Sequence, residues 1–225
     1  NMSAYEILKN RGVTRLCHFT NLARFVHIIS SEIGVCATAN IDQDIKRETD
    51  HARLDGECGY VCCSIEYPNS WFLRKAMERD IEEVFRDWIV LCIDLDVVRI
   101  TKIKYSPCNA SAGNGNYIYS NEEELDMLFD PVCVRMKRDP QILDCCATDD
   151  QAEILIENNI PREMISKIIV GNTVVAAQVY SILKVYGIRD ISIAVAPDVL
   201  NTNWSRIVRN GKRPEEMNFV PEGEM

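Results

Sequence analysis

The spacing of the apolar segments restricts the fold of this chain more than any other sequence feature. Short apolar runs of strand length recur at irregular intervals, and only some are followed by a stretch with helical spacing. The expected strands are 14–19, 60–66, 88–94, 152–156, 166–170 and 191–195, and the expected helices are 22–29, 70–77, 121–129 and 174–186. A doubly wound sheet needs regular strand–helix alternation, which this order lacks. The pattern therefore predicts an α+β fold with more strands than helices.

Length and composition predict one domain with a sizeable core. The chain has 225 residues, of which 47% are hydrophobic and 26% charged. We expect a single domain over residues 1–200 and a polar C-terminal extension over 201–225, loosely packed from Arg209 onward. No apolar run reaches the length of a membrane span, and the N-terminal residues lack the pattern of a signal peptide. The expected location is cytoplasmic, without a membrane partner.

Ten cysteines raise the question of disulfides or a metal site. Most of them lie inside apolar segments, which favours reduced thiols in the core. Zinc is the alternative, but the sequence has no Cys-x-x-Cys, and Cys58 with Cys62 lacks a second ligand pair at suitable spacing. We therefore expect no metal.

The charge pattern limits how this chain would meet nucleic acid. A net charge of -9 opposes broad, nonspecific attraction to phosphates. A local basic groove remains open, although solvated surface is the favoured interpretation of each basic pair taken alone. The pairs in question are Arg74 with Lys75, Lys102 with Lys104, and Lys137 with Arg138. Neither a Gly-x-Gly-x-x-Gly motif nor a Walker loop is present, so Rossmann and P-loop nucleotide sites are not expected.

An acidic, turn-like stretch runs into the apolar segment 152–156 and places Glu153 at its mouth. If Gln151 and Glu153 belong to one strand, they point to the same face. A glutamate in this place can stabilise positive charge or accept a proton, and Gln151 can contact a substrate. On these residues alone, a surface charge at a strand end is the simpler interpretation.

Four segments, taken in order, resemble the DarT family of DNA ADP-ribosyltransferase toxins. The ordered set carries the resemblance, because each short motif alone would occur by chance. The segments are Cys17-His18-Phe19-Thr20, Arg53-Leu54-Asp55-Gly56, Ser64-Ile65-Glu66-Tyr67-Pro68-Asn69 together with Cys108-Asn109-Ala110, and Thr148-Asp149-Asp150-Gln151-Ala152-Glu153. The similarity covers residues 14–170.

The resemblance implies a fold, a reaction and partners. The fold would be a split, strongly bent β-core of two small sheets with peripheral helices, holding NAD in the cleft between them. NAD would donate one ADP-ribose to a base of single-stranded DNA, with thymine as the expected base and no metal. The family's toxins pair with a DarG-like macrodomain antitoxin that removes the modification.

The resemblance also assigns roles to individual residues. Expected catalytic residues are Glu153 and Arg53; expected NAD-binding residues are His18, Phe19, Thr20, Arg53, Asp55 and Asn69; expected substrate contacts are Gln151, Asn109 and Trp71. Arg47 is the second candidate for the essential arginine. Local alternatives remain open: a core position for His18, a helix N-cap for Thr20, turns for the asparagines and core packing for Trp71.

Two rival functions remain. One is an enzyme of the same fold that acts on guanine, RNA or a protein side chain, because Gln151 and the turn before it would set the acceptor. A noncatalytic binding module is the other rival. The joint presence of His18, Arg53 and Glu153 argues against such a module, which has no physical reason to hold all three.

Overall fold

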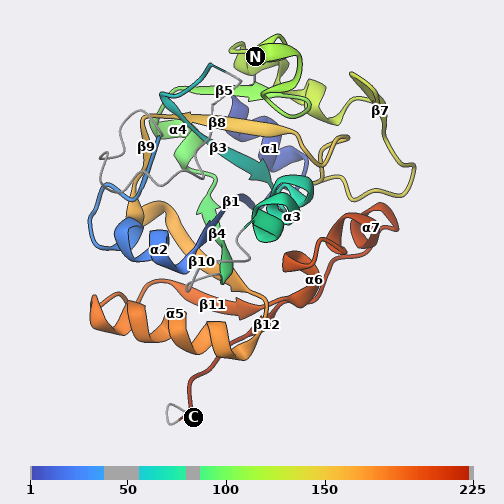
Figure 1. The fold of residues 1–225 in the computed structure, drawn as a ribbon. Helices are drawn as coiled ribbons and strands as arrows, with labels where there is room; N and C mark the ends of the chain where they lie inside the picture. The colour runs from blue at the N-terminus through green and yellow to red at the C-terminus, as the bar shows by residue number, and fades with distance from the viewer. Residues whose placement is uncertain (1, 38–55, 80–86, 223–225) are drawn as a thin grey trace.

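The computed structural model describes residues 2–37, 56–79 and 87–222, and arranges them as one large sheet with helices around it (Figure 1). The main sheet runs in the order β12 (Met217–Asn218), β11 (Ser192–Val195), β10 (Ile165–Val170), β4 (Trp88–Asp94), β1 (Arg15–Asn21), β3 (Tyr60–Ile65), β8 (Glu153–Glu157) and β5 (Ile103–Ser106). Two further pairs are β2 (Val35–Cys36) with β9 (Asn159–Ile160), and β6 (Val132–Cys133) with β7 (Met136–Lys137). The expected mixed fold with peripheral helices is confirmed.

The helices are short and lie at the ends and faces of the strands. They are α1 (Ala4–Asn10), α2 (Leu22–Ile29), α3 (Ser70–Arg79), α4 (Val97–Ile100), α5 (Thr173–Val185), α6 (Pro197–Leu200) and α7 (Trp204–Arg209). Short 3-10 segments are η2 (Ala112–Gly115), η3 (Glu122–Phe129) and η4 (Arg162–Met164). Asn121 caps η3 as expected, and α5 packs against β10, β11 and α2.

The main sheet is nearly divided between β1 and β3. β1 pairs with β4 along its whole length, from Arg15 to Asn21, but pairs with β3 only at Leu16 and Cys17. The split core is therefore present, although hydrogen bonds join the halves into one sheet rather than two separate ones. Beyond Cys17 the two strands diverge, and the ring of His18 reaches across instead, with Nδ1 2.9 Å from the carbonyl oxygen of Cys62.

The C-terminal segment corrects one expectation from the sequence. The described residues after 201 are more than a polar extension, because Trp204 and Val208 are buried and β12 extends the main sheet beside β11. The Trp204 ring stacks on Tyr67 with the ring centroids 5.1 Å apart. Beyond α7, Arg213 forms an ion pair of 2.9 Å with Glu66, which is 1% exposed. Trp204 and Val208 therefore belong to the core, while most residues from 210 to 222 are exposed.

The cysteines behave largely as core residues. Seven are buried, two are half-buried, and Cys58 is exposed. The burial confirms the expected core position of most cysteines. Within residues 2–37, 56–79 and 87–222, no helix is long and apolar enough to cross a membrane.

Candidate active site

Glu153 is a buried carboxylate at the first position of β8. β8 lies between β3 and β5, and Glu153 pairs with Ser64 on one side and Ser106 on the other. Its side chain is 8% exposed, and Oε2 accepts a hydrogen bond of 2.7 Å from the backbone N–H of Ala110. The simpler interpretation from the sequence, a surface charge at a strand end, is therefore wrong. A carboxylate held between two strands by a backbone donor has a fixed direction, as a catalytic group requires.

The turn before β8 differs from the expected extension of the strand. Asp149 Oδ1 accepts from the backbone N–H of Gln151 at 2.9 Å, and the Asp149 carbonyl accepts from that of Ala152 at 3.0 Å. Gln151 therefore lies in a turn, and the prediction that it shares a strand face with Glu153 is wrong. We call residues 148–152 the acceptor turn. Burial raises the pKa of Asp149 above its ordinary value.

The loop after β5 brings Asn109 and Ala110 to Glu153. Asn109 Oδ1 accepts from the backbone N–H of Ser111 at 3.0 Å and also from its hydroxyl group. Asn109 thus shapes the loop in the way a turn-forming asparagine does. The neighbouring Ala110 supplies the donor that holds Glu153, a role that a side-chain motif cannot reveal.

Asn69 joins the end of β3 to the start of α3. Its backbone N–H donates to Ser64 Oγ at 2.9 Å, and Oδ1 accepts from the backbone N–H of Phe72 at 3.2 Å. Asn69 is 2% exposed, and Nδ2 has no hydrogen-bond partner among the described residues. Such a buried donor costs free energy unless a ligand or water pairs with it.

β1 carries the three residues of the His-Phe-Thr motif on alternating faces. His18 and Thr20 share one face, while Phe19 lies on the other and packs edge-on against Trp88, with the ring centroids 5.6 Å apart. Thr20 is buried within the strand. The N-cap alternative for Thr20 is wrong, because Asn21 Oδ1 accepts from the backbone N–H of Arg24 and caps α2. Phe19 is thus directed away from the other two.

The first turn of α3 exposes an aromatic pair. Trp71 is 42% exposed, so the core-packing alternative for this residue is wrong. Its ring meets Phe72 edge-on with the centroids 5.1 Å apart, and Lys75 Nζ lies 3.7 Å from the Trp71 ring centroid. An exposed indole beside a cation suits stacking with a nucleobase.

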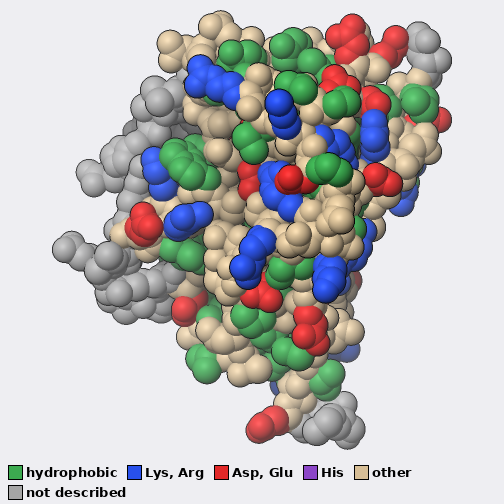
Figure 2. Space-filling view, turned by 90° about the vertical axis from the view of Figure 1, so that its right-hand side faces the viewer, with side chains coloured by type: hydrophobic (Ala, Val, Ile, Leu, Met, Phe, Trp, Pro, Cys, Tyr) green, Lys and Arg blue, Asp and Glu red, His purple; other side chains and the backbone are tan. Residues whose placement is uncertain are grey.

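On the side of the molecule that carries α6, α7 and β7, exposed Lys and Arg side chains lie interspersed with Asp and Glu side chains (Figure 2). Exposed cations there include Arg135, Lys137, Arg206 and Lys212. Two residues of the expected basic clusters are occupied elsewhere: Arg138 Nη1 donates to the Cys146 carbonyl at 2.8 Å, and Lys104 pairs with Glu57 at 2.6 Å.

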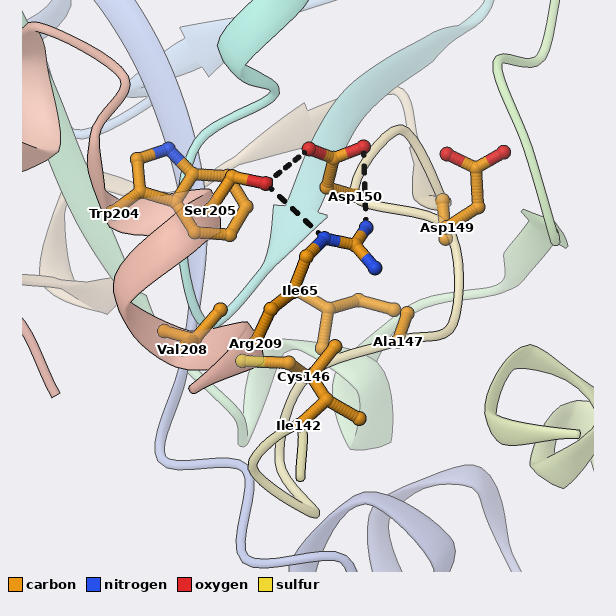
Figure 3. Close-up of a pocket in the computed structure, with 11 residues that line it drawn as sticks. Ile65, Ile142, Cys146, Ala147, Asp149, Asp150, Trp204, Ser205, Val208 and Arg209 are labelled. Carbon is orange, nitrogen blue, oxygen red and sulfur yellow. Dashed lines mark hydrogen bonds and ion pairs between the residues drawn. The ribbon is translucent and has the colours of Figure 1, made fainter. Parts of the chain in front are cut away.

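Two polar residues of α7 contact the acceptor turn and had no sequence signal of function. Ser205 Oγ donates to Asp150 Oδ2 at 2.8 Å, and Arg209 Nη2 lies 3.9 Å from Asp150 Oδ1 (Figure 3). Because the sequence predicted a polar extension here, neither residue was expected to belong to the site. The spacing of Trp204 and Val208, one helical turn apart, was the available signal for a packed helix.

The structure thus places Glu153, Asn69 and Asn109 around the start of β8 and His18 at the adjacent split. Gln151 lies in the turn before β8, and Trp71 follows Ser70, which contacts that turn. Arg53 and Asp55, with the alternative Arg47, lie outside the described residues. Within the described ranges, no group of three His, Cys, Asp or Glu residues is placed to hold a metal ion.

Solved structures share this fold at low sequence identity. DarT of Thermus sp. 2.9 in complex with ADP-ribosylated ssDNA matches with a TM-score of 0.59 and 16% identity, over 83% of this chain and 96% of that one. The same protein in complex with NAD+ matches with a TM-score of 0.56 and 15% identity, over 82% and 96%. DarTG of Thermosipho africanus in complex with ADP-ribose gives a TM-score of 0.56 and 16% identity, over 83% of this chain and 51% of that one.

The family comparison agrees with the motifs. A search among curated protein sequences finds no match. The family model described as "ssDNA thymidine ADP-ribosyltransferase, DarT" matches residues 17–204, which span the split sheet, the buried Glu153 and the acceptor turn. The match covers most of the chain and confirms the resemblance that the ordered motifs predicted, so the chain belongs to the DarT family of ssDNA thymidine ADP-ribosyltransferases.

Proposed function

We propose that this protein transfers one ADP-ribose from NAD to a thymine base of single-stranded DNA, with Glu153 as the central catalytic group. The observation that carries the proposal is the buried, backbone-anchored carboxylate of Glu153 at the mouth of β8. Membership of the DarT family supports the same reaction. The structures of Thermus sp. 2.9 DarT with NAD+ and with ADP-ribosylated ssDNA support the donor and the acceptor.

The chemistry explains why a carboxylate is needed. In the transfer, the bond between ribose C1′ and the nicotinamide nitrogen breaks, and a bond from C1′ to a base nitrogen forms. The ribose gains positive charge in the transition state, and a fixed anion nearby stabilises that charge. The base nitrogen loses its proton, and the same carboxylate is suited to accept it. Nicotinamide leaves as a neutral molecule, so charges and atoms balance.

The donor site is proposed from the polar groups at the split. The buried Nδ2 of Asn69 has no partner among the described residues and suits an acceptor oxygen of NAD. Because a carbonyl oxygen only accepts, His18 Nδ1 carries the proton in its contact with Cys62. In a neutral ring, Nε2 is then an acceptor, as a ribose hydroxyl requires. We propose Thr20 as a further polar contact, and place Phe19 behind the site as packing.

We retain Arg53 as the second catalytic group and Asp55 as the residue that orients it, on the motif alone. A guanidinium is suited to bind the diphosphate of NAD with two hydrogen bonds. For the acceptor we propose Gln151 as a base contact, Trp71 as a stacking surface and Asn109 as the residue that shapes the loop behind Glu153.

The biological setting follows from the family resemblance. We infer a toxin that is neutralised by a DarG-like macrodomain hydrolase able to remove the modification. Because NAD and single-stranded DNA are the proposed substrates, the cytoplasm is the proposed place of action. Base recognition would require no duplex opening, since single-stranded DNA already presents its bases.

Labelled NAD with oligonucleotides of each base composition tests the proposal. We expect transfer to thymine oligonucleotides by the wild type, and a rate at least about 100-fold lower for Glu153→Gln. Glu157→Gln, at the other end of β8, is the matched control and should keep most of the activity. No transfer to any oligonucleotide, or equal rates for Glu153→Gln and the wild type, would refute the proposal. Transfer to guanine oligonucleotides or RNA would instead support the rival acceptors.

A further inference from the structure

We propose that helix α7 takes part in acceptor selection, with Arg209 as a positioning residue that holds the acceptor turn through Asp150. This inference rests on the proposed transferase function. It extends the active site to a helix that lies 55 residues further along the chain than the turn it contacts.

The contacts form a connected polar network (Figure 3). Asp150 Oδ2 accepts from Ser205 Oγ at 2.8 Å, and Asp150 Oδ1 lies 3.9 Å from Arg209 Nη2. Arg209 Nε donates to Ser205 Oγ at 3.4 Å, while Nη1 donates to Asp139 Oδ2 at 2.6 Å. The Ser205 hydroxyl thus bridges Arg209 and Asp150, and the guanidinium also pairs with Asp139. The charge-assisted hydrogen bond to Asp139 orients the guanidinium, and Ser205 connects it to Asp150.

Asp150 also connects the acceptor turn to the aromatic helix. Ser70 Oγ, at the first position of α3, donates to Asp150 Oδ2 at 3.4 Å. The residue after Asp150 is Gln151, and Glu153 follows two positions later. Asp150 is therefore the point where the proposed base contact, the proposed stacking helix and α7 meet.

The space enclosed by this network is too small to be a ligand site. The side chains surround a cavity of about 10 Å³, which holds at most a water molecule. Arg209 and Asp150 have side chains 20% and 23% exposed, so neither is a freely solvated surface charge. The network therefore orients protein groups rather than binding a substrate directly.

The apolar side of α7 already anchors the helix. Trp204 is 3% exposed and stacks on Tyr67, and Val208 is 1% exposed. These contacts remain when the guanidinium of Arg209 is removed. The consequence of losing Arg209 should therefore fall on the acceptor turn and not on the fold.

A misplaced turn should change which nucleophile captures the ribose. When the base is held in line, its nitrogen bonds to C1′ and releases a proton. When it is not, water bonds to C1′, releases a proton, and NAD is hydrolysed to ADP-ribose and nicotinamide. Small errors in placement reduce the rate of a positioned reaction strongly, but water needs no such placement. The ratio of transfer to hydrolysis thus reports on the acceptor turn alone.

Arg209→Gln tests the inference, with Arg206→Gln on the exposed side of the same helix as its control. Both products are measured together with labelled NAD and a thymine oligonucleotide. For Arg209→Gln we expect transfer to fall about 10- to 100-fold, with hydrolysis and the KM for NAD within about twofold of the wild type. The KM for the oligonucleotide should rise. Arg206→Gln should keep the wild-type ratio.

Ser205→Ala is the second variant, and should shift the ratio in the same direction by a smaller factor. An unchanged ratio in both Arg209→Gln and Ser205→Ala would overturn the inference. So would a parallel loss of transfer and hydrolysis in both, because that pattern indicates general damage to the fold. If the wild type modifies no oligonucleotide, the proposed function is refuted. If the wild type modifies the oligonucleotide and the variants keep the same ratio, only the proposed role of α7 is refuted.

Discussion

At the scale of single residues, the site depends on polar groups that are buried and directed by neighbours. Glu153 is held by the Ala110 N–H, Asn69 by Ser64 and Phe72, and His18 by the Cys62 carbonyl. In each of these hydrogen bonds, one partner is a backbone group and the other is a side chain. Burial strengthens these interactions, because the surrounding dielectric is lower than in water.

Asp149 supplies a prediction about pH. Burial raises its pKa, so ionising this carboxyl costs more in the folded than in the unfolded chain. Its stability contribution is present below the unfolded pKa and is lost as pH rises through the folded pKa. Asp149→Asn keeps the oxygen that accepts from the Gln151 N–H and removes the charge. We expect a higher Tm than wild type at pH 7 to 8, and a difference that shrinks toward pH 4.

Thermal unfolding of both proteins across this pH range measures the effect. Asp144→Asn, five residues before Asp149 in the chain, provides a control in which an exposed carboxyl is removed. A Tm difference that stays constant with pH, or that grows as pH falls, would contradict the assignment of a raised pKa to Asp149.

At the scale of elements, the split between β1 and β3 and the close approach of β2 to β9 shape the surroundings of the site. β9 follows β8 after one residue, Asn158, whose φ of 66° lies in the left-handed region. β2 pairs with β9 and leads into residues 38–55, which contain Arg53. The β2–β9 pair, together with the hydrogen bond of 2.8 Å from the Ala37 N–H to the Asn158 carbonyl, therefore ties residues 35–37 to the end of β8.

Gly34 makes this approach possible. Its φ is +75°, and a Cβ there would lie 2.1 Å from the carbonyl oxygen of Ile160 on β9. Gly12 has the same φ, but a Cβ there would meet nothing within 4 Å. Comparing alanine variants of Gly12 and Gly34 separates the cost of backbone strain from the cost of the steric clash. Gly12→Ala should cost about 1–2 kcal/mol of unfolding free energy, and Gly34→Ala should cost more because β2 must also move away from β9.

Urea unfolding of the two variants gives the comparison, and NAD hydrolysis gives a second measurement. Gly34→Ala should lower hydrolysis while Gly12→Ala leaves it close to wild type. Equal losses of stability in both variants would show that the β2–β9 contact tolerates a side chain.

At the scale of the whole molecule, the C-terminal segment connects to the ends of β1 and β3. Arg213 reaches Glu66, and Glu216 reaches Arg15 at 2.6 Å, so ion pairs connect this segment to the ends of β1 and β3. Glu66 is buried and also accepts from the Thr14 N–H at 2.7 Å. Removing one partner from a buried charge leaves that charge uncompensated, which is strongly destabilising.

Trp204 provides a test of how much the C-terminal segment contributes to stability. Trp204→Ala removes a buried ring that stacks on Tyr67, and should lower the free energy of unfolding by about 3–5 kcal/mol. Val220→Ala, at a residue that is 57% exposed, should change it by less than about 0.5 kcal/mol. Chemical denaturation measures both. A small effect of Trp204→Ala would restore the interpretation of this segment as a loose extension.

Most strands and longer helices could be predicted from the sequence because burial leaves a local pattern. β3, β4, β10, β11 and α5 lie within one or two residues of the expected ranges. The failures had non-local causes. The Asp149 side chain accepts the hydrogen bond that forms the acceptor turn, so Gln151 lies in a turn and not in the strand. Helix α7 is short and has polar neighbours, so its helical periodicity is hard to detect in the sequence.

The sequence by itself determined the chemistry, because the ordered motifs placed a histidine, an arginine and a glutamate in a pattern typical of one family. The tertiary structure alone decided that Glu153 is buried between β3 and β5, that Ala110 holds it, and that α7 supports the turn in front of it. Motif residues are local and can be read in order along the chain. The residues that surround them in space cannot be read in this way. Strand pairing and the Asp150–Ser205 contact join segments that meet only when the core is packed.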